Sequence, residues 1–168
     1  MATDKKLINM LTEYAAAHQH PINILMHMIG IPTIMLGIFI PLTWFSFEIY
    51  NIQVSLAELI IFGFFVFYLS LDILFAFVFL IFAFLILFLA KILGNNLGDF
   101  SLYIGPLFLI VGYIGQFIGH GIEKSKPVLI KHPIQAHLAA PFFIVVELFK
   151  ILGLRERLFD EVQSRIKN

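Results

Sequence analysis

Three of the six histidines of this 168-residue chain stand close together near its N-terminus, in HQHPINILMHMIG (residues 18–30). His18 and His20 precede Pro21, and His27 lies inside the apolar run that follows. An imidazole beside hydrocarbon costs free energy unless something pairs with it, and neutral imidazole is a common metal ligand. A histidine metal site is therefore one role that these residues could have.

Three more histidines lie in the last third of the chain: His120, His132 and His137. Gln116 precedes His120 by four residues, as Asn23 precedes His27, so each pair shares one face of a helix. With Glu123 nearby, these polar side chains could orient the second nitrogen of each ring. The chain has no cysteine, so nitrogen and carboxylate ligands remain, and iron(II), zinc and copper are the candidate ions.

The composition is that of an integral membrane protein. Hydrophobic residues make up 60% of the chain and charged residues 13%, whereas about a quarter of a typical soluble domain is charged. The net charge is zero and no basic stripe indicates nucleic acid. The N-terminal segment is polar and periodic, which is not typical of a cleaved secretory signal.

The hydrophobic pattern predicts a single all-α domain, a polytopic membrane helix bundle. The apolar run from residue 54 to 93 would measure about 60 Å as one helix, twice the hydrocarbon thickness. It must therefore form two spans, with a turn in YLSLD (68–72), and a loop is expected at 93–99. The predicted segments are a surface amphipathic helix within 1–20, spans at 25–46, 54–71, 73–92 and 102–122, a re-entrant segment or fifth span at 134–153, and a charged tail at 154–168.

The basic residues favour four spans over five. Four spans would place ten of the eleven basic residues on one side, leaving Lys91 opposite, whereas a fifth span would divide them five against six. The positive-inside tendency then predicts cytoplasmic termini, with residues 134–153 folded back into the membrane or its interface. An even number of spans also brings all six histidines to that side. Four glycines of the last span are expected to permit close helix packing: Gly105, Gly112, Gly115 and Gly119.

Two blocks of the sequence resemble the signatures of the fungal 2-hydroxy fatty acid dioxygenase family. These are YAAAHQHPINILMHMIGIPTI, which begins at Tyr14, and GQFIGHGIEKSKPVLI, residues 115–130. A third stretch, QAHLAAPFFIVVELF, resembles the C-terminal block of the family. The resemblance implies an iron(II)-dependent membrane dioxygenase that uses molecular oxygen to remove one carbon from 2-hydroxy fatty acids by α-oxidation. It also implies a substrate taken from the bilayer and contact with membrane lipid, and a homo-oligomer is a candidate state.

Carried over by position, the resemblance makes His18, His27 and His120 the expected catalytic metal ligands. Because all six histidines are expected on one side of the membrane, we also predict that His132 or His137 completes the site. Expected neighbours of the site are Asn23, Gln116 and Glu123. Lys124 and Lys126 are the basic residues nearest to His120 in sequence. They are expected either to guide the substrate carboxylate or simply to mark the cytoplasmic interface.

Three other functions also fit the sequence. His27 and His120, on different spans, could be the axial ligands of a haem. The histidines could instead form a zinc site in a lipid hydrolase. A non-enzymatic scaffold or lipid-binding protein could carry its histidines passively in the membrane interface, where His20 would only begin a helix.

Overall fold

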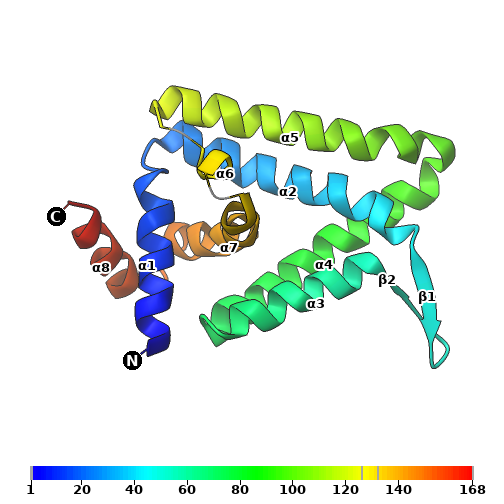
Figure 1. Ribbon diagram of the computed structural model, residues 1–168, viewed down its shortest axis with the longest axis horizontal. Helices are drawn as coiled ribbons and strands as arrows, with labels where there is room; N and C mark the ends of the chain where they lie inside the picture. The colour runs from blue at the N-terminus through cyan, green and yellow to red at the C-terminus, as the bar shows by residue number, and fades with distance from the viewer. Residues whose placement is uncertain (1, 126, 132, 168) are drawn as a thin grey trace.

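A computed structural model describes residues 2–125, 127–131 and 133–167 (Figure 1). The predicted all-α class is confirmed, and four helices are long and apolar enough to cross a membrane, beginning at Pro21, Ile73, Gly98 and Pro133. The helices are α1 (Ala2–Ala16), α2 (Pro21–Thr43), α3 (Leu56–Leu69), α4 (Ile73–Asn96), α5 (Ser101–Glu123), α6 (Val128–Lys131), α7 (Pro133–Ile151) and α8 (Glu156–Lys167), with a 3-10 turn, η1 (Gly98–Phe100).

The chain passes back and forth through α2, α3, α4 and α5, as the hydrophobic pattern predicts. Pro21 occupies the first turn of α2, where a missing N–H donor costs nothing. The turn between α3 and α4 lies within 68–72, and the Asp72 carboxylate there accepts the Phe75 N–H at 3.0 Å. This cap satisfies one of the four N–H donors that a helix start leaves without an intrahelical partner.

Several predicted boundaries are wrong because an antiparallel hairpin of β1 (Ser46–Ile49) and β2 (Ile52–Ser55) follows α2. The hairpin ends α2 at Thr43 and shortens the expected 54–71 span to the 14 residues of α3. In addition, α4 continues to Asn96, so the loop expected at 93–99 is mostly helical.

By length, α7 with 19 residues suits a span better than α3. Figure 1 shows α7 partly end-on, so its axis is not parallel to those of α2 and α5. Whether α7 or α3 crosses the membrane stays a prediction.

The apolar face of α1 is covered by protein, contrary to the expectation of a helix lying on the membrane surface. Leu7, Leu11 and Tyr14 are buried in the core of the molecule. The covering elements are α8 and α7, and Val162 of α8 is itself only 3% exposed. Because α8 is also amphipathic, the two helices bury their apolar faces against each other, and both termini lie at the same end of the molecule (Figure 1).

Glycines at a spacing of seven residues bring α2 and α5 into close antiparallel contact (Figure 1). A Cβ at Gly112 would lie 2.9 Å from the Gly30 carbonyl oxygen, and one at Gly37 would lie 2.8 Å from the Gly105 carbonyl oxygen. Gly119 continues the row beside Asn23. The expected packing role is therefore confirmed for Gly105, Gly112 and Gly119. It is wrong for Gly115, where a Cβ would meet no described atom within 4 Å.

Candidate metal centre

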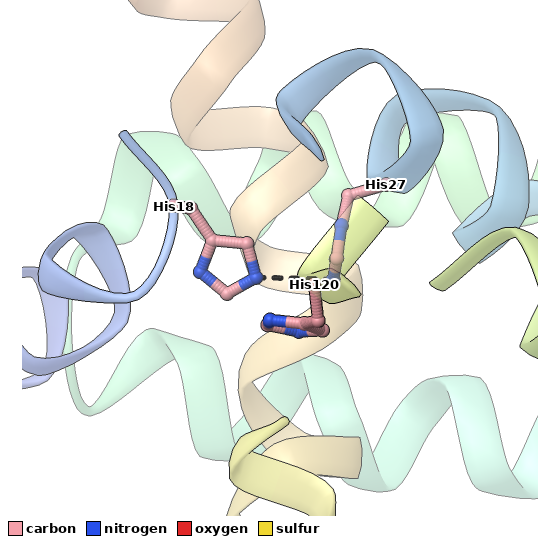
Figure 2. Close-up of side chains that lie close together, drawn as sticks. All are labelled: His18, His27 and His120. Atoms are coloured by element: carbon pink, nitrogen blue, oxygen red, sulfur yellow. Dashed lines mark hydrogen bonds between the residues drawn. The ribbon is translucent and has the colours of Figure 1, made fainter. Parts of the chain in front are cut away.

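Three histidines from three different segments converge at one end of the bundle (Figure 2). His18 follows α1, His27 lies in the second turn of α2, and His120 lies in the last turn of α5. Their side chains are buried, with 2%, 3% and 4% exposure respectively. One ring nitrogen from each histidine lies within 4.8 Å of the other two. This group is the one that the sequence predicts as the core of a metal site.

A tight turn between α1 and α2 carries His18 into the group. The Ala17 N–H donates to the Tyr14 carbonyl and the His18 N–H to the Ala15 carbonyl, both at 3.1 Å, so the helix tightens and ends. The His18 ring then stacks on the Tyr14 ring, with centroids 4.1 Å apart and planes 5° apart. Phe143 of α7 packs against both rings. Contact with two aromatic rings restricts the orientation of the His18 imidazole.

Each of the three histidines uses its Nδ1 atom for an orienting hydrogen bond. His18 Nδ1–H donates to the Tyr14 carbonyl oxygen at 2.7 Å, and His27 Nδ1–H donates to the Asn23 carbonyl oxygen at 2.9 Å. A carbonyl oxygen only accepts, so the proton of both neutral rings is on Nδ1. His120 Nδ1 bonds to the Ser125 hydroxyl at 2.8 Å. A hydrogen bond at one ring nitrogen that leaves the other free is the arrangement of metal-bound histidine.

The Nε2 atoms of His18 and His27 are 3.0 Å apart (dashed line in Figure 2). With both protons on Nδ1, these atoms present two lone pairs to each other, so a bond between them would need one ring to be an imidazolium. Burial and the neighbouring His27 ring lower the pKa of His18 to about 3, which disfavours that charge at neutral pH. Two nitrogens bound about 2.1 Å from one ion are roughly 3.0 to 3.4 Å apart. The donor set therefore fits a single metal ion.

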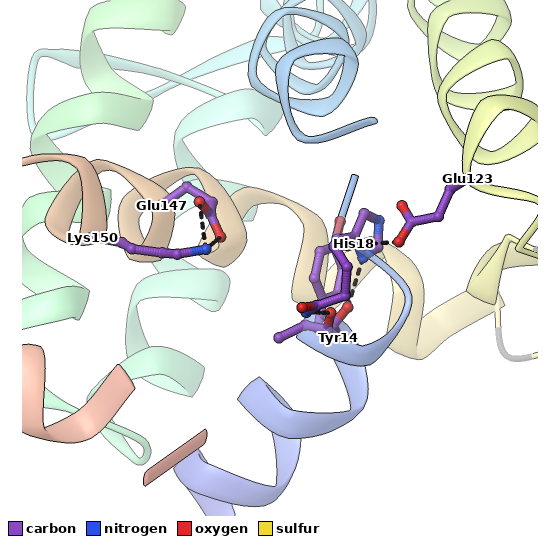
Figure 3. A network of polar contacts seen from close by, with 7 residues as sticks. Tyr14, His18, Glu123, Glu147 and Lys150 are labelled. Carbon is purple, nitrogen blue, oxygen red and sulfur yellow. Dashed lines mark hydrogen bonds and ion pairs between the residues drawn. The ribbon is translucent and has the colours of Figure 1, made fainter. Parts of the chain in front are cut away.

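Glu123 ties the segments that carry the three histidines to one another. Its Oε1 atom accepts the Gln19 N–H at 2.6 Å, and its Oε2 atom accepts an N–H from the Asn23 side chain. The Asn23 amide also donates to the Ala17 carbonyl at 3.2 Å. Figure 3 shows Glu123 facing the turn that carries His18. Asn23 thus orients His27 through its backbone carbonyl, while its side chain joins α2 to the turn and to α5.

The remaining predicted residues have other surroundings. His20 caps α2, since its Nδ1 accepts the Ile22 N–H at 3.2 Å, as expected of a helix-start residue. His137 is exposed and bonds at both nitrogens, to the Pro133 carbonyl and the Tyr113 hydroxyl, each at 2.7 Å. Lys124 is exposed and ends α5 with a left-handed backbone (φ 58°). His132 and Lys126 lie outside the described residues.

An apolar cavity of about 290 Å³ extends from the histidines into the bundle. One face of α2 lines it from His27 to Phe39, about 18 Å along the helix axis. Phe64 of α3 and Phe79 of α4 also line the cavity, as does Gln116, which precedes His120 by four residues on α5. The arrangement combines three histidines that could hold a metal ion with an apolar pocket of the kind that holds a single long-chain ligand.

Sequence reasoning missed Ser125 and Phe143. Ser125 follows the end of α5, and only the left-handed Lys124 turns the chain back so that the serine hydroxyl reaches His120. Hydrogen bonds from the Ser125 and Lys124 N–H groups to the His120 and Gly121 carbonyls close this Schellman turn. A lysine at that position, where glycine is usual, gives no sequence signal for the turn.

The fold and the site define a polytopic membrane helix bundle with a buried three-histidine centre at the head of an apolar cavity. The family described as 2-hydroxy-palmitic acid dioxygenase Mpo1-like matches residues 5–152, and the chain belongs to this family. It is 32% identical over 153 residues to the Saccharomyces cerevisiae protein named 2-hydroxy-palmitic acid dioxygenase MPO1, an alignment that covers 90% of this chain and 84% of the yeast protein. No solved structure shows a significant match.

Proposed function

We propose that this protein is an iron(II)-dependent dioxygenase that shortens 2-hydroxy fatty acids by one carbon, with the reaction taking place at the three-histidine centre. The observation that carries the proposal is the group of three buried histidines at the head of an apolar cavity, each of which offers one ring nitrogen within 4.8 Å of the other two and makes a hydrogen bond at Nδ1. The family and the name of the yeast relative support the choice of substrate. His18, His27 and His120 would hold the iron.

The residues of the chain suit the chemistry of such a centre. Iron(II) held by imidazoles with open positions supplies the oxygen chemistry of non-haem oxygenases. The low pKa of His18 keeps its ring neutral, and hydrogen bonds to Tyr14, Asn23 and Ser125 orient the three rings before an ion binds. The acyl chain would lie along the apolar face of α2, which excludes water from the head group.

The geometry favours one ion over a haem. The ring centroids of His27 and His120 are 4.9 Å apart and their planes are perpendicular, which leaves no space for a porphyrin between them. Zinc would fit the same nitrogen ligands. A zinc-dependent lipid hydrolase therefore remains the alternative that metal analysis must separate from the dioxygenase.

Elemental analysis of the purified full-length protein, combined with oxygen uptake on 2-hydroxypalmitate, tests the function. We expect one equivalent of iron per chain, and oxygen uptake that accompanies formation of a fatty acid one carbon shorter. Bound zinc with no oxygen uptake would favour the hydrolase. Retention of iron by the single variants His18→Ala, His27→Ala and His120→Ala would show that the ligands are elsewhere.

His20→Ala is the matched control for these variants. His20 lies two residues from His18 but bonds to the backbone of α2 rather than facing the other rings. The variant should lose a helix cap, worth about 1 kcal/mol of stability, and keep its metal. A larger loss of metal in His20→Ala than in His18→Ala would contradict the assignment of His18.

A further inference from the structure

Gln116 is a polar residue of the cavity wall that has no partner for its amide nitrogen. It lies on α5 four residues before His120 and lines the cavity together with His27. Its Nε2 atom is buried and finds no hydrogen-bond partner among the residues that the structure describes. Leaving a buried donor unsatisfied costs free energy, so such a group is expected to serve a ligand or a mechanism.

The orientation of the histidines does not account for Gln116. Tyr14, Asn23 and Ser125 provide the hydrogen-bond partners of the three Nδ1 atoms, and Gln116 bonds to none of these rings. Its amide instead lies against Gly30, where a Cβ would come within 2.5 Å of Nε2. The missing side chain of Gly30 therefore provides the space that the amide occupies.

The position of this amide is where a head group would end and an acyl chain begin. Gly30 follows His27 by three residues, so the amide is about one helical turn, 5 Å, along α2 from that ligand. Beyond it the wall is apolar, with Ile34 and Ile38 next on the same face. No lysine or arginine appears among the described lining residues, and Lys124 is exposed. The Tyr113 hydroxyl in that wall is already bonded to His137.

We propose that the Gln116 amide donates a hydrogen bond to the carboxylate of the substrate, and so recognises a long-chain acid at the metal centre. A carboxylate only accepts hydrogen bonds, and a buried N–H donor with no other partner complements it. This contact rests on the proposed function for the identity of the acid. It assigns to Gln116 the task that the sequence suggested for Lys124 and Lys126.

The test compares two ligands of the same chain length in metal-loaded, full-length protein: 2-hydroxypalmitate and 1,2-hexadecanediol, which lacks the carboxylate. Gln116→Met keeps the length of the side chain and removes its donor. The variant should bind the acid about tenfold to a hundredfold more weakly, the usual loss for a hydrogen bond to a charged group. Its affinity for the diol and its metal content should change little, and its melting temperature without ligand should not fall. Gln53→Met, on the exposed hairpin strand β2, is the control and should match the unsubstituted protein.

Three results would overturn the proposal: an unchanged affinity for the acid, an equal loss of affinity for acid and diol, or loss of metal with loss of stability. Equally, an unsubstituted protein that binds neither ligand would overturn it. If Gln116→Met does not fold, Gln116→Asn, which keeps the amide but shortens its reach, is judged by the same comparison. An unsubstituted protein that binds the acid without oxidising it would refute the proposed function, while the acid-to-diol comparison would still decide the role of Gln116.

Discussion

The contact between α2 and α5 determines how far apart His27 and His120 lie, and a single methyl group at Gly112 should disturb it. A Cβ there would lie 2.5 Å from Ile34 Cγ1 and 2.9 Å from the Gly30 carbonyl oxygen, whereas ordinary contacts begin at 3.4 Å. The isoleucine side chain can move aside. The carbonyl belongs to the backbone of α2, so Gly112→Ala must push the two helices apart by roughly half an ångström locally.

Two opposing effects determine the size of the change. Overpacking of a close contact costs about 1 to 3 kcal/mol. Alanine in place of glycine within a helix returns about 0.5 to 1 kcal/mol. Gly115→Ala provides the matched control, since a Cβ at that position would meet no described atom within 4 Å. The control keeps the helix-propensity gain alone, so the difference between the two variants isolates the contact and should be about 1 to 3 kcal/mol.

Thermal unfolding of both variants in the same detergent measures this difference, and metal titration measures its effect on the site. We expect Gly112→Ala to melt at a lower temperature and to bind metal more weakly, because its ligands come from the two helices that separate. Gly115→Ala should melt at the same or a higher temperature and bind metal normally. Equal behaviour of the two variants would refute the packing role of the glycine row.

Three further predictions concern positions around the centre and the bundle. Glu123→Gln should weaken metal binding by less than the about tenfold to hundredfold loss expected for a direct hydrogen-bond partner of a ligand, because Glu123 acts through Gln19 and Asn23. The exposed Glu13→Gln should leave metal binding unchanged, and equal metal titrations of the two variants would show that Glu123 does not hold the His18 turn. Lys91→Met removes the ammonium group that lies 2.5 Å from the Glu58 carboxylate. This single variant should melt at a lower temperature than the double variant Lys91→Met, Glu58→Gln, because the single change leaves a carboxylate without its cation in an apolar region. A double variant that melts lower than the single variant would contradict this. Single cysteines at Thr3 and Ser164 should react alike with an impermeant reagent in intact cells or vesicles, since α1 packs against α8; opposite labelling would show that the termini lie on different sides.

Hydropathy predicts the long helices because their length and apolar composition are needed to cross hydrocarbon, whatever their neighbours. The hairpin of β1 and β2 could not be predicted in the same way. Its two strands have four residues each, and its turn residues, Tyr50 and Asn51, both have positive φ values (49° and 62°). A two-residue hairpin turn with positive φ at both positions usually contains Asn-Gly. Because tyrosine stands in the first position here, the sequence gives no signal for the turn.

The apolar faces of α1 and α8 show a different limit. Amphipathic periodicity predicts which face of a helix is buried, and the predicted burial of Leu7 and Leu11 is confirmed. It does not say whether lipid or protein covers that face. Here each of the two helices covers the other, which depends on the path of the chain through all the segments between them.

For the candidate site, residue type and topology predict which histidines lie on one side of the membrane. The hydrogen bonds of each ring, which only the structure gives, then show which of those histidines belong to the site. The predicted topology gathers all six histidines on one side of the membrane, and the described part of the chain confirms the convergence of three. His20 and His137 are excluded from that group by their own bonds, to the Ile22 N–H and to the Tyr113 hydroxyl. His18, His27 and His120 differ because each bonds to a neighbour at Nδ1 and still offers one ring nitrogen within 4.8 Å of the other two histidines. The first two bonds run to a carbonyl four residues earlier, a spacing that the sequence contains. The third depends on a left-handed lysine, which only the folded chain shows.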